Sequence, residues 1–458
     1  MSSPLNGGVS HWWNSIGLPA PRPALPGSTD VDVCIVGAGY TGLWTAYYLR
    51  RADPTLRVMV LEERFAGFGA SGRNGGWLTN SVTGEPGQYV ASHGFDAATR
   101  QQRALTDTVH EVVRVAAAEG IDADIHLGGE LVVARSRPQQ ERLRAALAEA
   151  RRWPDAGWIE LSARESAERI ALTDVLGGMW HPHCARVHPA KLVVGLAAAA
   201  ERAGVVIHEA TRAEEIRPGQ VRTSYGTVRA AHVIRATEGF TARLPGQRRT
   251  WLPMNSSLIV TEPLPAAAWD AIGWAGRETL GDSAHVYMYA QRTADDRIAF
   301  GGRGKPYRFG SAIDSDGSTP PDTVAALRDL LLRFFPVLGD VAIEHAWSGV
   351  LGVPRDWSAT VSHDRRTGLG HAGGYVGTGV AATNLAGRTL ADLVLGRDTD
   401  LTTLPWVNHR ARRWEPEPLR WLGVQAMYAA YRAADRAEDG GRRTTSPVAR
   451  IADVISGH

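Results

Sequence analysis

The sequence predicts an α/β protein that combines a doubly wound, Rossmann-like parallel sheet with an α+β region containing a large, mostly antiparallel sheet. Residues 31–61 read as strand, glycine-rich turn, helix and strand, which is a βαβ unit. Residues 251–300 alternate several short strand-like pieces, a pattern typical of an antiparallel sheet. The chain of 458 residues is too long for one small core, so two domains or one interleaved pair are expected.

The individual elements follow from hydrophobic period and from helix-terminating residues. Residues 31–36 and 58–61 are short and apolar, as in buried parallel strands, and 40–51 place apolar side chains at helical spacing between them. Asp322 is a suitable N-cap and Gly396 a suitable C-cap for two later helices. Further helices are expected at 96–118, 138–152, 189–203, 322–335 and 380–395, and further strands at 130–134, 205–208, 233–236, 257–261, 285–289 and 297–300. The polar tail from residue 436 is expected to be partly loose.

The bulk composition excludes several classes of protein. The net charge of +2 is too small to indicate nucleic-acid binding, and no run approaches the ~20 apolar residues of a membrane span. Residues 1–29 lack the basic and apolar regions of a secretory signal and are expected to form an arm. Cys34 and Cys184 provide no disulfide framework, so a cytoplasmic location is expected. His181 and His183 have no further ligand at useful spacing, so no metal site is expected.

A glycine-rich turn follows the first strand and opens the first helix, as in a dinucleotide clamp. Gly37 permits the tight turn, Gly39 lets the backbone approach a pyrophosphate, and Gly42 lets the helix pack close to the strand. The start of the helix offers free N–H groups to phosphates. Glu62, at the end of the second strand, can accept hydrogen bonds from both ribose hydroxyls. The complete motif is Gly37-Ala38-Gly39-Tyr40-Thr41-Gly42.

A second loop of small residues separates FAD from NAD as the expected cofactor. Exposed N–H groups in such a loop suit a second phosphate and let a flavin ring lie against the backbone. A surface linker would explain its glycines but not the interposed polar residues. The loop contains Ser71, Gly72, Arg73, Asn74, Gly75 and Gly76.

The segments VDVCIVGAGYTGLWTAYYL and GFGASGRNGGW resemble the FAD-dependent D-amino-acid oxidase superfamily, in the branch of glycine, sarcosine and gamma-glutamylputrescine oxidases. Within this branch the chain resembles bacterial aminophosphonate-type FAD oxidoreductases. The resemblance spans most of the chain and implies an interleaved architecture. It implies an FAD-binding domain from 30–100, 185–250 and 340–400, a substrate domain from 101–184 and 251–339, an arm at 1–29, and a tail at 401–458 that packs on the body.

The resemblance also assigns further residues to the cofactor. It implies a backbone contact from Ala213 to adenine and places Thr237 after the strand that closes over the dinucleotide. It implies that Gly377, Gly379 and Val380 lie against the flavin pyrimidine end, where a helix start would stabilise the negative charge of a reduced flavin. Some relatives attach the flavin through a cysteine in this region, but residues 347–379 contain none. Non-covalent FAD is therefore expected.

Candidate catalytic residues come from the antiparallel region. Arg303, between glycines, could clamp a carboxylate or phosphonate, or could be a structural guanidinium. Lys305 is a candidate for assisting dioxygen, as a basic residue does in relatives. His285, Tyr287 and Tyr289 would alternate on the strand expected at 285–289, where their common face could line the pocket or belong to the core.

The expected activity is FAD-dependent oxidation of a small amine or amino acid, with an acidic substrate such as an aminophosphonate as the narrower hypothesis. A hydride would pass to flavin N5, water would hydrolyse the imine, and dioxygen would be reduced to hydrogen peroxide. Two alternatives stay open. One is a dehydrogenase of a hydroxy acid or amine with another electron acceptor, and the other is a non-catalytic flavoprotein subunit.

Overall fold

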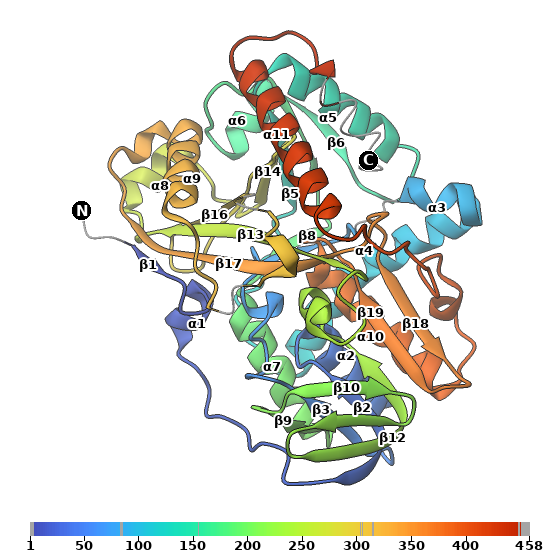
Figure 1. Cartoon of the computed structure of the whole chain (residues 1–458). Helices are drawn as coiled ribbons and strands as arrows, with labels where there is room; N and C mark the ends of the chain where they lie inside the picture. The colour runs from blue at the N-terminus through green and yellow to red at the C-terminus, as the bar shows by residue number, and fades with distance from the viewer. Residues whose placement is uncertain are drawn as a thin grey trace.

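The computed structural model describes residues 4–82, 86–153, 155–302, 304, 306–313, 316–447 and 449. Figure 1 shows a sheet built mainly from parallel strands in the lower half of the molecule and a mostly antiparallel sheet in the upper half. The α/β class expected from the sequence is therefore confirmed.

The lower sheet has a parallel centre. Its parallel-paired strands are β2 (Thr29–Val36), β3 (Val58–Leu61), β9 (Val206–His208), β12 (Gly226–Arg235) and β19 (Leu369–Gly373). Antiparallel strands extend it: β10 (Ala213–Arg217), β11 (Gln220–Thr223) and β18 (Thr360–Asp364). The helices beside it are α2 (Tyr40–Ala52), α4 (Phe95–Ala118), α7 (Pro189–Arg202) and α10 (Gly379–Leu395). The first βαβ unit thus forms as the sequence predicts.

The upper sheet is antiparallel except where β1 pairs with β17 and β5 with β14. Its strands, in spatial order, are β1 (Leu5–Asn6), β17 (Ile343–Val353), β13 (Leu252–Thr261), β16 (Ile298–Gly302), β15 (Tyr289–Arg292), β14 (Thr279–Asp282), β5 (Glu130–Ala134), β7 (Gly177–His181) and β6 (Ile159–Ser162). Its helices are α5 (Arg137–Ala150), α6 (Ala163–Arg169), α8 (Ala266–Ile272) and α9 (Pro321–Phe334).

Several further elements complete the structure. A short ribbon pairs β4 (Trp77–Thr79) with β8 (Cys184–Arg186). The arm contains α1 (His11–Ile16), which contacts α7, and α3 (Pro86–His93) packs on α4. The long helix α11 (Leu419–Asp439), red in Figure 1, crosses the upper half.

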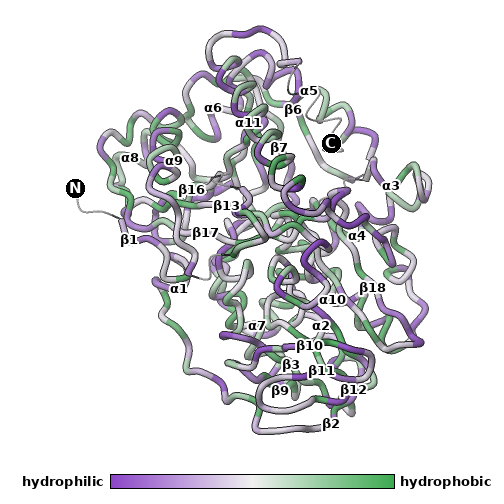
Figure 2. Tube along the Cα trace, viewed as in Figure 1, coloured by the Kyte–Doolittle hydropathy of each residue, from purple (hydrophilic) through white to green (hydrophobic). Residues whose placement is uncertain are grey.

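The apolar interior forms two main clusters, a lower one that also takes in side chains of β13, β16 and β17, and an upper one. Trp44, Trp347 and Leu385 belong to the lower cluster, and Trp274 and Phe300 to the upper one. Figure 2 shows hydrophobic residues along α7 and β3, which lie inside the lower half. Burial of this apolar area is the main favourable term in folding.

Close packing of α2 against its neighbours depends on two glycines. A Cβ atom at Gly42 would lie 2.0 Å from the carbonyl oxygen of Gly37, so the helix could not rest on the preceding turn. A Cβ atom at Gly387 of α10 would lie 2.6 Å from Cβ of Trp44. The close helix–strand packing predicted for Gly42 is confirmed.

Three local predictions were wrong. Residues 285–288 form no strand, because the N–H groups of His285 and Val286 donate to the Asp435 carboxylate instead of to a sheet neighbour. The helix expected to begin after Asp322 begins at Pro321, whose fixed φ suits the first turn. Helix α11 was not predicted, and it extends to Asp439, into the region expected to be loose.

Across the part of the chain that the structure describes, no helix has both the length and the apolar character needed to cross a membrane.

The substitution Gly387→Ala should lower the free energy of unfolding by about 1–3 kcal/mol, because the new methyl group would overlap Trp44 in a packed interface. The matched control is Gly423→Ala in α11, where no atom other than those of the adjoining residues and the backbone of the helix itself lies within 4 Å of the added methyl group. That change should stabilise the helix by up to about 1 kcal/mol. Thermal or urea unfolding of both variants checks the contrast, and equal effects would contradict it.

Candidate functional site

A cavity of about 510 Å³ opens at the carboxyl ends of the parallel strands and reaches β17 of the upper sheet. This edge is where open α/β sheets bind ligands. Many of the predicted cofactor residues line it: Gly37, Gly39, Tyr40, Thr41, Glu62, Ser71, Asn74, Ala213, Thr237, Gly377, Gly379 and Val380. The structure therefore brings together segments that lie more than 300 residues apart in the sequence.

The first glycine turn shapes one wall of the cavity. Gly37 has φ of +108°, and a Cβ atom there would lie 2.5 Å from the Ala236 carbonyl oxygen, so the turn needs a residue without a side chain. Gly39 is the N-cap of α2 and gives that helix no side-chain cap. The N–H of Tyr40 donates to Oγ of Ser71 (2.8 Å), which ties the two loops together. The positive end of α2 thus faces the cavity.

Glu62 lies just after β3 and stabilises this wall through hydrogen bonds. Its carboxylate accepts N–H bonds from Ala38 and Arg64, both at 2.9 Å. Burial, the largest effect, raises the pKa of Glu62 to about 7 despite these two bonds. The carboxylate lines the cavity, so its remaining lone pairs can accept hydrogen bonds from a ligand.

A second helix N-terminus lines the same cavity. Helix α10 begins at Gly379 without a side-chain cap, and Gly377 just before it has φ of +110°. The hydroxyl groups of Tyr375 and Thr41, 3.1 Å apart, link this region to α2. Two uncapped helix starts on one cavity make it suited to a ligand with several negative charges.

Glu238 connects three segments around the cavity and was not identified from the sequence. Its carboxylate accepts N–H bonds from Gly352 (3.1 Å) and Gly374 (3.0 Å), joining β17 to the segment before α10. Burial raises the pKa of Glu238 to about 7. Its φ of +40° is rare for a residue with a side chain. The acid between Thr237 and Gly239 in the turn after a buried strand was the available signal.

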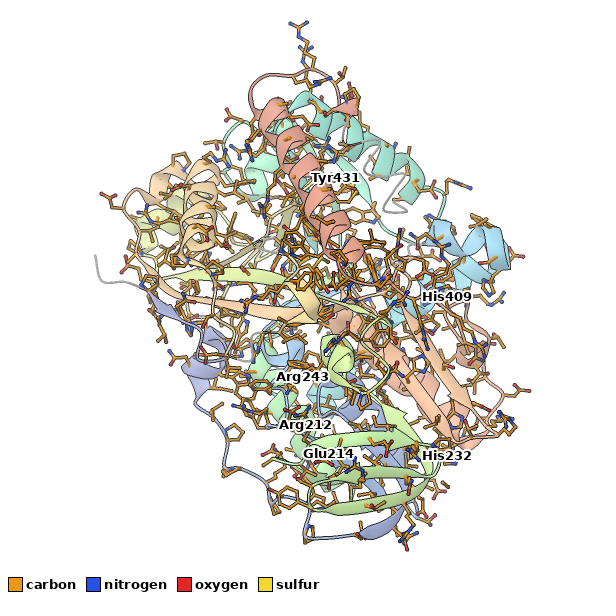
Figure 3. All side chains as sticks on the ribbon, in the orientation of Figure 1. Arg212, Glu214, His232, Arg243, His409 and Tyr431 are labelled. Atoms are coloured by element: carbon orange, nitrogen blue, oxygen red, sulfur yellow. The ribbon has the colours of Figure 1, made fainter. Side chains whose placement is uncertain are left out.

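The outer end of the cavity is polar. Arg243 donates to Glu63 (3.1 Å), while Arg212 and Glu214 flank Ala213 at the start of β10. Figure 3 shows Arg212, Glu214 and Arg243 together near the lower sheet. Charged residues that can reach solvent suit the exposed end of an extended ligand.

Other residues of the second loop support the wall from behind rather than lining the cavity. The Arg73 guanidinium is buried, donates to the Phe68 carbonyl (2.8 Å), and lies over the Phe68 ring at 4.5 Å. Four predicted glycines likewise lie behind the cavity wall, where added Cβ atoms would meet neighbouring groups. They are Gly42 of α2 and the loop residues Gly72, Gly75 and Gly76. These residues fix the loop's position.

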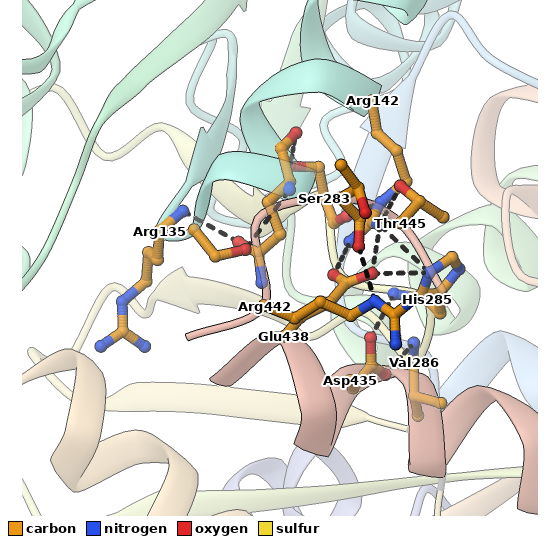
Figure 4. A network of polar contacts seen from close by, with 12 residues as sticks. Arg135, Arg142, Ser283, His285, Val286, Asp435, Glu438, Arg442 and Thr445 are labelled. Atoms are coloured by element: carbon orange, nitrogen blue, oxygen red, sulfur yellow. Dashed lines mark hydrogen bonds and ion pairs between the residues drawn. The ribbon is translucent and has the colours of Figure 1, made fainter. Parts of the chain in front are cut away.

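Of the four predicted catalytic residues, the two that the structure describes, His285 and Tyr287, do not line the cavity. Arg303 and Lys305 lie outside the described residues. Tyr287 is exposed, and His285 belongs to a polar network that joins α5 to the end of α11 (Figure 4). There Nε2 of His285 lies 3.3 Å from the Glu438 carboxylate, which also pairs with Arg142 at 2.8 Å. This network anchors α11, and its carboxylates are already engaged by cationic or N–H partners.

Comparison with known proteins decides the family. The family model for FAD dependent oxidoreductases (DAO) matches residues 32–393. The chain belongs to this family. It is an FAD-dependent oxidoreductase, as its two clamp loops predict.

Individual relatives agree with this membership. Gamma-glutamylputrescine oxidoreductase of Escherichia coli (strain K12) is 31% identical over 389 residues, covering 82% of this chain and 86% of the relative. A probable oxidoreductase, OrdL, of Rhizobium meliloti (strain 1021) is 30% identical over 429 residues, covering 88% and 92%. The crystal structure of glycine oxidase from Bacillus cereus superposes with a TM-score of 0.67 at 18% identity, covering 83% of this chain and 99% of that one, which shows the shared fold.

The described residues fit FAD as the family implies. The glycines at 37 and 39 let the turn lie close to Ala236 and Ser71 at the wall of the cavity, and both helix starts that line the cavity lack side-chain caps. The pyrophosphate would meet the start of α2, the flavin pyrimidine end would meet the start of α10, and Glu62 would accept from the ribose.

In the FAD-free protein, ionisation of Glu62 should lower the free energy of unfolding as the pH rises, and the substitution Glu62→Gln should remove this loss. The pKa of Glu62 is raised from 4.5 to about 7, so its stabilising contribution is complete below pH 4.5 and is lost as the pH rises through 7. Glutamine mimics the protonated acid. The variant should therefore gain about 1–3 kcal/mol relative to the natural protein between pH 4.5 and 8.

Urea unfolding at a series of pH values measures this gain. The control is Glu63→Gln, because the Glu63 carboxylate pairs with Arg243 at the outer end of the cavity. A gain of the same size in both variants, or a gain that grows toward low pH, would contradict the assignment.

Proposed function

We propose that this FAD-dependent oxidoreductase oxidises a small amine or amino acid and uses dioxygen as its electron acceptor. The observation that carries the proposal is the cavity on which α2, α10 and Glu62 converge, because these three features would hold the pyrophosphate, the flavin and the ribose of an extended dinucleotide. The names of its relatives, gamma-glutamylputrescine oxidoreductase and glycine oxidase, support an amine or amino acid as the substrate.

The proposed chemistry needs the substrate as a free amine beside the flavin. Bound FAD would supply the two-electron oxidant. The two electrons and two protons that the amine loses would leave as hydrogen peroxide after transfer to dioxygen. The substrate loses hydrogen across its C–N bond, and water then hydrolyses the resulting imine to a carbonyl compound and an amine or ammonia. The protein's contribution is position and electrostatics.

The upper sheet provides a polar surface next to the second clamp loop. A Cβ atom at Gly75 would lie 2.8 Å from the Tyr289 ring, so this ring lies directly against the loop. The Tyr289 and Ser256 hydroxyl groups are 2.9 Å apart on neighbouring parts of the sheet. We assign Tyr289 and Ser256 to the substrate side of the flavin, where their hydroxyl groups could orient an amine.

The FAD is proposed to be non-covalent. No cysteine lines the cavity among the described residues. Cys34 is buried in a smaller apolar cluster of the lower sheet, with Val36 and Met59. Cys184 is buried with its sulfur 3.2 Å from the Thr279 hydroxyl. Burial raises the pKa of both thiols, which disfavours the thiolate needed for attachment.

The purified protein should be yellow, and acid precipitation should leave all its flavin in the supernatant. Aerobic addition of amines and amino acids from a panel should yield peroxide with at least one of them, and the same compound should bleach the flavin under anaerobic conditions. Bleaching without aerobic peroxide would replace dioxygen by another acceptor. Absence of bleaching by any amine would overturn the proposed substrate class.

An acidic amine such as 2-aminoethylphosphonate is the narrower proposal, and it depends on Arg303. Loss of one charge-assisted, bidentate contact costs about 1.5–3 kcal/mol, so Arg303→Ala should raise KM for acidic amines roughly tenfold or more. KM for neutral amines should change little. Steady-state peroxide assays with matched acidic and neutral amines measure the difference, and an equal rise for both would refute the role of Arg303.

A further inference from the structure

A second cavity, of about 320 Å³, lies between the arm and the upper sheet. It is bounded by α1, by the start of α7, and by the turn between β15 and β16. None of its lining residues lines the cavity assigned to FAD. It is therefore a separate site, and the proposed oxidation does not use it.

Arg186 is the unusual residue of this cavity. It is 7% exposed, its Nε has no hydrogen-bond partner, and its guanidinium forms no ion pair with any residue in the described ranges. The backbone cannot easily turn the side chain away, because Arg186 exchanges two 3.0 Å hydrogen bonds with His126 and pairs with Trp77 in the β4–β8 ribbon. A buried charge without a partner is energetically costly, so this side chain is suited to bind an anion.

The other charged groups around the cavity are already paired. Nζ of Lys191 lies 2.9 and 3.0 Å from the two Asp124 carboxylate oxygens, and Asp295 pairs with Arg297 at 2.6 Å. Nearby Arg277 and Arg292 both pair with Asp296. Arg297 also pairs with Glu344 at 2.6 Å. With Glu344 included, four carboxylates face five cations, so one positive charge is left unbalanced, and Arg186 is the cation without an ion pair in the described part of the chain.

Neutral polar groups complete the wall. The pKa values of His11 and His188 are lowered to about 4, mainly by burial, so both rings are neutral at physiological pH. Nδ1 of His188 accepts the Lys191 N–H (3.2 Å), so Nε2 carries the proton and donates to Ser15 Oγ (3.0 Å). Nδ1 of His11 is buried and has no partner. The cavity thus combines one guanidinium with unsatisfied neutral groups.

We propose that this cavity binds a small organic monocarboxylate through the Arg186 guanidinium. A carboxylate matches the planar donor fork of arginine and carries the single negative charge that the cavity lacks. A phosphate dianion would bring excess charge close to Asp124 and Asp295, which line the same cavity. The volume of about 320 Å³ leaves room for a small organic acid.

The site is connected to the second clamp loop by short hydrogen bonds. The N–H of Val187 donates to the Gly76 carbonyl at 2.8 Å, and Gln291, which lines the cavity, donates to the Gly75 carbonyl at 2.7 Å. Trp12 also lines the cavity and donates to the Asn74 carbonyl at 2.8 Å. Tryptophan fluorescence is therefore a suitable reporter of binding.

The test titrates the FAD-loaded protein with sodium acetate or propionate at constant ionic strength, following tryptophan fluorescence and the unfolding temperature. Saturable changes that sodium chloride does not produce are expected. Arg186→Gln should weaken binding about tenfold or more while leaving FAD content unchanged. The matched control Arg229→Gln, at an exposed position of the lower sheet, should bind acetate as the natural protein does.

A second variant, Ala294→Trp, keeps Arg186 and fills the cavity from its exposed lining residue. It should abolish carboxylate binding even if Arg186→Gln fails to fold. The proposal is overturned if chloride reproduces the acetate response, if Arg186→Gln or Ala294→Trp binds acetate with natural affinity, or if inorganic phosphate binds and the carboxylates do not.

Discussion

The structure depends on one steric constraint, which is the close approach of α2 to the ends of the parallel strands. Gly37 passes within contact distance of the Ala236 carbonyl, and Gly42 rests on the carbonyl of Gly37. Any side chain at these positions would push the helix away from the sheet. Because α10 packs on α2 through Gly387, the same displacement would move the second helix start as well. The cavity exists because these backbones touch.

The sequence made the lower half of the molecule largely predictable, because its signals are local. A βαβ unit with glycines at fixed spacing specifies strand, turn and helix within one short segment, and β3 has the predicted bounds. The upper half was less predictable. Residues 285–288 have strand-like composition, but Asp435, about 150 residues away, captures their N–H groups. No local pattern could show that competition.

The contrast between local signals and long-range contacts also explains which site residues were found from the sequence and which were missed. Glu62 follows a strand at a characteristic spacing and was found from that spacing. Glu238 acts by joining β17 to the segment before α10, and these partners lie more than 110 residues away along the chain. Arg186 was missed for a related reason. An arginine in an arginine-rich sequence carries no signal, and its significance comes from the pairing of every neighbouring charge.

Both cavities hold ionisable side chains whose charged form is energetically unfavourable. Glu62 and Glu238 are held where burial opposes ionisation, and Arg186 is held where no anion balances it. Such groups persist when the surrounding fold fixes them and a ligand repays part of the cost. For Glu62, ribose hydroxyl groups would donate to the ionised carboxylate and so favour the charged form. Ligand binding and the protonation of Glu62 are therefore coupled. A ligand that prefers the ionised carboxylate must bind more tightly as the pH rises toward and past the pKa of Glu62.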